Sequence, residues 1–397
     1  MTHGNLLLGA VAALAIVTTL FSMAALLWAS RRRLLPAFTP PVTIFKPLKG
    51  VDEDLEQNLR TFFQLDYPTY QILFGVADPG DPAVGVVEEL LREFPASDAR
   101  LIAGCPAFGL NPKVENLAGM YPHRKYDTIL ISDSNVRVRP SYLRETACYL
   151  GNPGVGLVSN LFAGTGEARL GAALENLQLN GFIAGGIALA AATGATCVVG
   201  KSMLMPARVL DEIGGLAGVR NLLAEDQVLA LRVRAAGYAV RLSHHVIENV
   251  NRGRDLRWFL NRHSRWYKLR RRLAFPAFLL EPAVNLGVVG LVWALSADSG
   301  IAWGGLLFLV GLGMARDAVQ TRWLRGSFPK AGHLLLSPVK DLFLLPLWFD
   351  ALVNDRVQWR GNVRVIGHYT RLRLSRVPRA VRRRVRRARR LRSRSEP

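Results

Sequence analysis

The chain has 397 residues, with 51 Lys and Arg against 30 Asp and Glu and a formal net charge of +21. Half of the residues are apolar although 20% are charged, so the apolar residues must be concentrated in blocks, which excludes a purely soluble composition. Cys105, Cys148 and Cys197 form no CxxC pair, so neither a disulfide framework nor a zinc site is indicated, in agreement with a reducing cytoplasm.

The first apolar block covers residues 5–29 and contains no charge. At about 1.5 Å per helical residue it is long enough to cross a hydrocarbon core of about 30 Å. A signal peptide is the alternative, but the block exceeds the usual length of about 7–15 residues and has no Lys or Arg before it. Residues 1–33 are therefore predicted to form a transmembrane anchor with a basic flank. Arg31–Arg33 place the following domain in the cytoplasm, because cationic flanks stay inside.

After a linker at 36–41, apolar segments alternate with amphipathic ones. Strands are expected at 42–50, 70–78, 99–104 and 126–133, and helices at 52–66, 82–94 and 111–121. This alternation predicts an α/β fold with a parallel sheet covered on both faces. Ligands bind such sheets beyond the carboxyl ends of the strands, where Asp78 and Asp133 stand.

The second half begins with a Gly- and Ala-rich apolar segment at 168–195, which is interrupted by Glu175 and Asn180. A helix at the membrane interface, or one lining a lipid-facing groove, fits this composition better than a full span. A strand, a turn and a helix follow at 196–216. A helix at 222–238 begins with Glu225 and Asp226, and a strand follows at 239–249.

The C-terminal third carries further membrane segments, with C-terminal membrane helices expected over 276–353. The apolar runs 276–297 and 301–315 predict a helical hairpin. The stretch 333–353, with Lys340, Asp341 and two prolines, is interpreted as interfacial or re-entrant, because a further span would place the basic tail outside.

Residues 354–397 are predicted to form a basic cytoplasmic tail, with thirteen arginines and no acid from 371 to 394. Such a tail cannot form a core, and we expect it to contact anionic lipid headgroups. Nucleic acid is not an expected partner, because the chain lacks an RNA-binding aromatic signature and zinc spacing. Deletion of 371–397 is expected to leave activity largely intact.

Two aspartates at strand ends are candidate residues of a nucleotide-binding site. Asp78, in GVADPGDP, can reach the ribose or base of a nucleotide, or can simply cap a turn. Asp133, in ISDSNVRV, can hold a divalent metal that neutralises a departing nucleoside diphosphate. Asn135 stands where a second acid would strengthen that site, and its neutral oxygen leaves a weaker metal site.

Asp226 is the candidate base that removes the proton of an acceptor hydroxyl, although acids at a helix N-terminus also interact favourably with the helix dipole. Arg262 and Arg265 share one helix face and can bind a diphosphate. Trp266 can pack against acceptor, sugar or membrane. The alternative for this R-x-x-R-W cluster is a juxtamembrane basic belt. Lys113 is a further candidate for diphosphate contact.

The motifs KPLKGVDEDLEQNLRTFFQLDYP, GLNPKVENL, DSN, CVVGKSM, LLAED and RHSRW occur in this order between residues 41 and 275. Together they resemble the ceramide glucosyltransferase family of membrane-bound, processive-type glycosyltransferases. The resemblance implies a nucleotide-diphospho-sugar transferase (GT-A) fold over 41–275, and a UDP-sugar donor, UDP-glucose. It also implies inversion at the anomeric carbon and a divalent metal, Mg²⁺ or Mn²⁺. The acceptor would be ceramide or a similar membrane lipid on the cytoplasmic face.

The resemblance also assigns residues. The family's first and second aspartates fall on Asp78 and Asp133, its catalytic base on Asp226, and its (Q/R)-x-x-R-W motif on Arg262, Arg265 and Trp266. Lys46 and Lys113 join the residues expected to bind the donor nucleotide, and Glu225 joins the diphosphate and acceptor group.

The stretch LNGFIAGG departs from the family's animal members, which carry His-Pro-Arg in that region, so the acceptor stays open. Short loops and the Ala- and Arg-rich composition indicate a bacterial protein, a multi-pass protein of the inner membrane. One alternative is transfer of N-acetylglucosamine from its UDP donor to a hopanoid polyol. A polysaccharide synthase would need more spans to form a channel, and a non-enzymatic membrane scaffold would leave the ordered acids unexplained.

Overall fold

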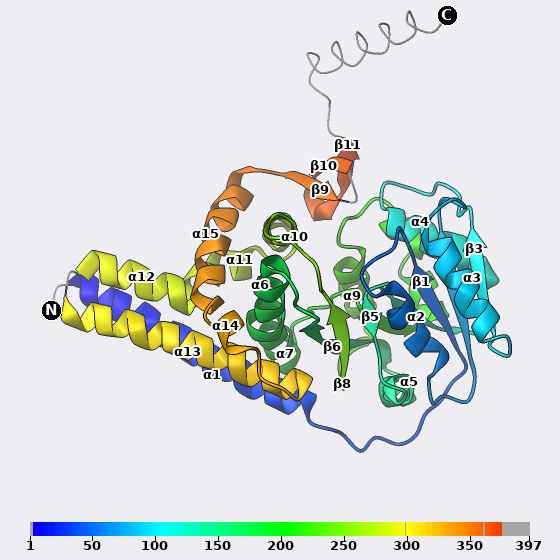
Figure 1. Ribbon diagram of the computed structural model, residues 1–397, viewed down its shortest axis with the longest axis horizontal. Helices are drawn as coiled ribbons and strands as arrows, with labels where there is room; N and C mark the ends of the chain where they lie inside the picture. Colours follow the sequence, from blue (N-terminus) through cyan, green and yellow to red (C-terminus); the bar gives the residue numbers. More distant parts are fainter. Residues whose placement is uncertain (1–2, 298, 360–361, 375–397) are drawn as a thin grey trace, which may run out of the picture.

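The computed structural model describes residues 3–297, 299–359 and 362–374. An α/β domain is joined to a bundle of long helices that extends from one side of it (Figure 1). The domain is built on an eight-stranded sheet with the order β3-β2-β1-β4-β7-β6-β8-β5. Its strands are β1 Val42–Pro47, β2 Tyr70–Val76, β3 Ala99–Ala103, β4 Thr128–Ser132, β5 Val136–Arg137, β6 Val155–Thr165, β7 Ser202–Pro206 and β8 Ala239–Val250.

The sheet is mixed, which corrects the expectation of a parallel sheet. Strands β1 to β4 are parallel, as the alternation of strands and helices predicts. Strand β7 runs antiparallel between β4 and β6, and β5 runs antiparallel to β8. The buried strand β6, for which the sequence made no prediction, pairs with β8 along most of its length. Its sequence, VGLVSNLFAGT, mixes Gly, Ser and Asn with apolar residues, so it lacks a clear strand pattern.

Helices cover both faces of the sheet, as expected, because neighbouring strand residues point to opposite sides. Ile44 packs into the core beneath α2, α3 and α5, whereas Phe45 packs into the core beneath α4, α8 and α9. These helices are α2 Leu55–Phe63, α3 Ala83–Glu93, α4 Pro112–Met120, α5 Tyr142–Ala147, α8 Ala207–Glu212 and α9 Glu225–Ala235. Short 3₁₀ turns occur at η1 Tyr121–His123, η2 Cys148–Gly151, η4 Leu216–Val219 and η5 His368–Thr370.

The helix bundle contains α1 (His3–Ser30), α12 (Leu286–Ala297) and α13 (Gly300–Arg325), which lie side by side (Figure 1). Within the described residues, α1 and α13 are long and apolar enough to cross a membrane. A bent pair, α11 (Phe275–Val284) and α12, passes the same test together, with a bend of 58°. The break falls at Asn285, whose backbone is extended and whose side chain accepts from the Val288 N–H at 3.1 Å, so that this residue ends α11 and caps α12. The predicted helical hairpin is present.

The Gly- and Ala-rich segment forms one helical run: α6 (Leu170–Gln178), a π-helical turn η3 (Leu179–Ile183) and α7 (Ala184–Ala192). The expectation of an interfacial helix is wrong for α6, in which residues 171–178 are all buried. Its polar side chains have partners inside the protein; Asn176, for example, donates to Glu167 at 2.8 Å. The helix lies between the sheet domain and the bundle, with α7 against α1.

The C-terminal region contains α14 (Ala331–Leu334) and α15 (Ser337–Val353), which packs against α10 (Leu256–Leu273). Residues 354–374, expected to begin the tail, instead form a three-stranded antiparallel sheet. Its strands are β9 Arg356–Trp359, β10 Asn362–Ile366 and β11 Leu372–Leu374. The remaining tail, 375–397, lies outside the described residues, so its contact with anionic headgroups stays a prediction.

Candidate active site

A cavity of 420 Å³ opens beyond the carboxyl ends of β1 and β4, between the N-termini of α4 and α9 and one face of α10. Seven of the predicted site residues line it: Lys113, Asp133, Glu225, Asp226, Arg262, Arg265 and Trp266. Residues separated by more than 150 positions in the sequence are thus brought to one site.

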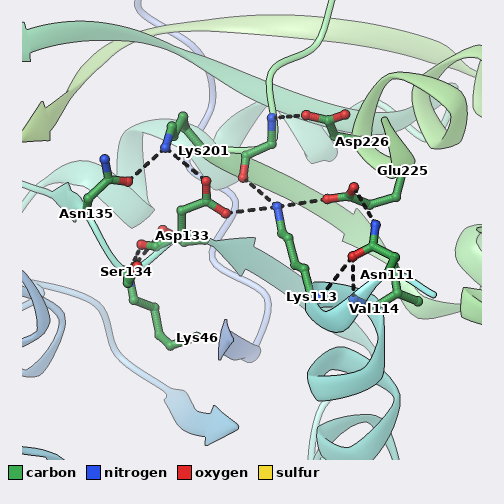
Figure 2. Close-up of polar contacts among 12 residues, drawn as sticks. Lys46, Asn111, Lys113, Val114, Asp133, Ser134, Asn135, Lys201, Glu225 and Asp226 are labelled. Carbon is green, nitrogen blue, oxygen red and sulfur yellow. Dashed lines mark hydrogen bonds and ion pairs between the residues drawn. The ribbon is translucent and has the colours of Figure 1, made fainter. Parts of the chain in front are cut away.

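Asp133 lies between two lysines at the end of β4 (Figure 2). Lys113 Nζ is 2.9 Å from Asp133 Oδ1, and Lys201 Nζ is 3.0 Å from Oδ2. Burial alone would raise the pKa of Asp133, but the two ammonium groups outweigh it and hold this pKa far below its usual value. The carboxylate is therefore ionised and fully paired in the donor-free site.

Lys113 is positioned by the start of α4. Asn111 caps this helix by accepting from the Lys113 and Val114 backbone N–H groups, and Pro112 occupies the first turn. The Lys113 ammonium also contacts Glu225 Oε1 at 3.1 Å. Burial opposes its charge, but the surrounding carboxylates raise the pKa of Lys113, which keeps the cation in place.

The two neighbouring acids of α9 have different surroundings. Glu225 is buried and accepts from Asn111 Nδ2 at 3.0 Å besides contacting Lys113, and burial raises its pKa. Asp226 is partly exposed, and its Oδ2 accepts from the Gly200 backbone N–H at 2.6 Å. A Cβ at Gly200 would lie 2.9 Å from that oxygen and 2.8 Å from Lys113 Nζ, so only glycine fits there. Asp226 is thus the better placed acid to meet a substrate.

Lys201 lines the site, although no sequence pattern predicts a role for it. It precedes β7, and its Nζ donates to Asn135 Oδ1 at 2.8 Å as well as contacting Asp133. Burial lowers the pKa of Lys201, and Asp133 counteracts this effect. The CVVGKSM motif contained this lysine, but only the pairing of β4 with β7 reveals its partner.

Two predicted donor-site residues are not brought to the cavity. Asp78 is exposed, and its Oδ1 accepts from the Gly80 N–H at 2.9 Å, as in the turn-capping alternative. Lys46 is fully buried below the site, where it donates to the Asp133 backbone oxygen at 2.7 Å and lies 3.7 Å from the centre of the Phe62 ring. Burial holds the pKa of Lys46 well below its usual value. Lys46 supports Asp133, and the predicted nucleotide contact is not possible for this buried side chain.

The R-x-x-R-W residues lie on α10 and form one wall of the cavity. Arg262 is stacked between two indoles, with its guanidinium 5.1 Å from the Trp258 ring centre and 4.6 Å from that of Trp266. Its Nε is 3.0 Å from Glu175 Oε1, and His263 Nε2 is 2.8 Å from Glu175 Oε2. Glu175, on α6, was noted in the sequence only as an interruption of an apolar run.

The C-terminal sheet also reaches the cavity. Gln358 and Trp359 of β9 line it opposite the strand ends. The sequence assigned these residues to a tail, and short strands after a membrane segment carry no signal for where they fold back.

A divalent metal fits this cavity only as an ion shared with a substrate. Among the described residues, no cluster of three or more His, Cys, Asp or Glu could hold one. Both oxygens of Asp133 and the oxygen of Asn135 already accept from lysines. Asp133 and phosphate oxygens of a bound substrate would together hold such an ion, as is common for Mg²⁺, and the ion would supply Lewis-acid neutralisation of the phosphate charge.

Comparison with known proteins identifies the family. The profile of glycosyl transferase family 21 matches residues 7–371. The chain belongs to this family. Family 21 membership, together with the order of the sheet, confirms the predicted resemblance to ceramide glucosyltransferases and the GT-A fold. This family 21 member is a hexosyltransferase that acts on a lipid.

Among its relatives, ceramide glucosyltransferase 3 of Caenorhabditis elegans is 30% identical over 341 residues, covering 82% of this chain and 72% of that protein. The ceramide glucosyltransferase of Komagataella phaffii is 27% identical over 433 residues, with 84% of each chain covered. Solved structures are more distant. The mannosyltransferase PcManGT of Pyrobaculum calidifontis, in complex with GDP-Man and Mn²⁺, has a TM-score of 0.47 and 15% identity, covering 86% of this chain and 99% of that one. TarS 1–349 of S. aureus with UDP-GlcNAc has a TM-score of 0.39 and 10% identity, covering 82% and 96%.

Proposed function

We propose that this protein transfers glucose from UDP-glucose to the hydroxyl of ceramide or a similar membrane lipid, with inversion at the anomeric carbon. The observation that carries the proposal is the convergence of Asp226, the lysine-paired Asp133 and the R-x-x-R-W face of α10 on one cavity. The curated relatives named ceramide glucosyltransferase support the choice of sugar and acceptor.

The cations of the cavity suit a departing UDP. Lys113, Lys201, Arg262 and Arg265 all line it, and the first two face Asp133. Positively charged groups fixed before reaction stabilise charge that develops on the leaving group. A bound Mg²⁺ or Mn²⁺, held by Asp133 and the phosphates, would add Lewis-acid neutralisation of the same charge. Direct base or ribose contact by Asp78 stays a prediction.

Asp226 is the proposed general base. The Gly200 N–H donates to its Oδ2 and the Gln227 N–H to its Oδ1, so the carboxylate is held in one orientation at the cavity wall. In an inverting displacement the acceptor hydroxyl attacks the anomeric carbon opposite the leaving UDP and loses its proton to this carboxylate. Glu225 is less suited to this role, because it is buried and its carboxylate is paired with the Lys113 ammonium, whereas Asp226 is partly exposed.

The acceptor is proposed to enter from the membrane. Helix α10 carries Trp266 at the cavity and continues directly into α11, the first half of the bent pair. We place α1, the bent pair and α13 across a bacterial inner membrane, α15 at its surface and the GT-A domain in the cytoplasm, next to Arg31–Arg33. An acceptor with one hydroxyl at the headgroup level then reaches the cavity without leaving the bilayer.

The alternative keeps the chemistry and changes both substrates: N-acetylglucosamine moves from UDP-N-acetylglucosamine to a hopanoid polyol. The acceptor is open because the Leu179–Ile183 turn stands where the family's animal members carry His-Pro-Arg. Mass spectrometry of lipids from a host expressing this chain decides between the two, with Asp226→Asn as the inactive control. A new lipid heavier by a hexose supports the proposal, one heavier by an N-acetylhexosamine supports the alternative, and no new lipid contradicts both.

A further inference from the structure

A second cavity, of 460 Å³, lies on the opposite side of the Asn221–Ala224 segment from the α4 N-terminus, between η4 and the C-terminal sheet. Its charged lining is entirely basic: Arg220, Arg232, Arg371, Arg373 and His368. No Asp or Glu is among the described residues that line it. A hollow with this lining has a positive electrostatic potential and attracts anions.

The arginines of this basic cavity are available to a ligand. None of the four forms an ion pair within the part of the chain that the structure describes. Arg232 donates to the backbone oxygens of Ile213 at 3.3 Å and Gly218 at 3.2 Å, which fixes its guanidinium. Gathering four like charges is unfavourable until an anion neutralises them, and guanidinium groups match phosphate oxygens in geometry.

The backbone at the cavity is held in an unusual conformation. Tyr369 and Thr370 have φ values of 52° and 61°, a region that residues other than glycine rarely adopt and β-branched ones such as threonine least of all. This turn presents His368 and Arg371 to the same hollow. Strained positions of this kind persist where the surrounding structure or a ligand requires them.

The same turn forms hydrogen bonds with the segment that precedes Asp226, the proposed general base. Leu223 N–H donates to the Thr370 oxygen at 3.1 Å, and Leu372 N–H donates to the Asn221 oxygen at 2.7 Å. On its other side, Asn111 Nδ2 donates to the Leu222 oxygen at 2.7 Å and to Glu225. The Asn221–Ala224 segment is therefore clamped between the basic cavity and the α4 N-terminus, one residue before Glu225.

We propose that the basic cavity binds a phosphate group, either of a soluble phosphate or of a lipid headgroup, and that its occupancy stabilises the clamped segment and raises the rate of transfer. Binding at the cavity is independent of the proposed sugar transfer, whereas the effect on rate rests on it. An anion bound by both Arg220 and Arg371 would hold the Asn221–Ala224 segment against the turn that contains Thr370. The backbone that leads to Asp226 would then be more rigid, and the Asp226 carboxylate would be held more firmly in place.

The test uses the full-length protein in phosphatidylcholine nanodiscs with saturating UDP, so that the active-site cavity is occupied. Inorganic phosphate is added at constant ionic strength, and the thermal midpoint is measured. At about tenfold excess over its Kd we expect a rise of about 2 °C. Arg371→Gln with Arg373→Gln should lose most of this rise. Arg234→Gln, an exposed arginine of α9 outside the cavity, is the matched control and should keep it.

A second arm identifies the source of the phosphate. Nanodiscs containing about one-fifth phosphatidylglycerol are compared with pure phosphatidylcholine, and the initial rate of transfer is measured. A rate increase that the double variant loses, without any effect of inorganic phosphate, assigns the site to a lipid headgroup. Equal responses of the double variant and Arg234→Gln to both probes overturn the proposal. If the double variant does not fold, Arg220→Gln replaces it, since the Arg220 backbone, not its side chain, bonds Leu110 and Asn111.

Discussion

Glu175 and Arg262 form a buried ion pair, with 3.0 Å between Glu175 Oε1 and Arg262 Nε. This pair joins helix α6 to the R-x-x-R-W face of α10 at the active-site cavity. Glu175 is fully buried, and its Oε2 contacts His263, the residue that follows Arg262 on α10. The guanidinium is stacked between two tryptophans, so the carboxylate sets the rotation at which it meets the cavity. Glu175 is thus a positioning residue for Arg262.

Replacing Glu175 with Gln should impair donor handling and stability together. The buried Arg262 loses its counter-charge, which costs about 3 kcal/mol of stability for a pair of this kind. We expect KM for UDP-glucose, the proposed donor, to rise by about tenfold, with a smaller change in kcat, because the proposed role of Arg262 is to bind the donor diphosphate rather than the reacting hydroxyl. The control is Glu167→Gln, which breaks a comparable pair with Arg325 away from the cavity. Equal KM changes in the two variants would show that Glu175 has only a structural role.

Asp226→Asn should abolish transfer but preserve donor binding. The amide oxygen can still accept from the Gly200 N–H, but the amide NH₂ then faces the Gln227 N–H, so one hydrogen bond is lost together with the basic group. We expect kcat to fall by about 10²–10⁴, the usual range for a general base. The Kd of UDP, measured by calorimetry, should change less than about threefold. An Asp226→Asn enzyme with undiminished kcat would refute the assignment of the base.

Lys201→Met should show that Lys201 and a divalent metal compete for the Asp133 carboxylate. With one ammonium removed, Asp133 keeps only Lys113, so the carboxylate is more available to a cation. Mn²⁺ binding, followed by electron paramagnetic resonance with saturating UDP, should tighten by about tenfold, while UDP affinity measured without metal falls by a similar factor. Lys125→Met, which removes a surface pair with Asp98, is the control and should change neither value. Unchanged Mn²⁺ binding in Lys201→Met would mean that the lysines do not compete with the metal.

Much of the site could be predicted because its residues follow local patterns. Asp133 ends a buried strand and Asp226 opens a helix, and each pattern is readable within a dozen residues. Lys46 was misassigned because a position near a strand end does not say to which face the side chain points. Glu175 and Lys201 could not be assigned, since their partners lie 87 and 68 positions away in the sequence. The strands β6 and β9 were missed for the same reason: their pairing partners, not their own composition, make them strands.

Stability should decrease as the pH falls, through His245. Burial lowers the pKa of His245 to about 4 although Glu145 Oε2 is 2.7 Å from its Nδ1. The unfolded chain binds a proton near pH 6.5 and the folded chain does not, so stability is complete above about pH 6.5 and declines from there toward pH 4. The loss is at most about 3 kcal/mol, from a difference of about 2.5 pKa units. Thermal midpoints of the wild type and His245→Asn across this range test it; parallel pH profiles would contradict the assignment.

Two C-terminal truncations should differ sharply, which revises the expectation that deletion of 371–397 leaves activity intact. Deletion of 375–397 leaves β11 and its bonds in place, and we expect nearly full transfer activity in detergent. Deletion of 371–397 removes Leu372, which donates to Asn221, and the bridge between Leu222 and Arg371. The segment before Glu225 then loses one side of its clamp, so kcat should fall by about tenfold, a cost of about 1.4 kcal/mol in the activation free energy. The activities of the two truncated proteins are compared at equal folded concentration, checked by UDP binding. If the two truncated proteins have the same kcat, the C-terminal sheet does not help to position Asp226, the proposed general base.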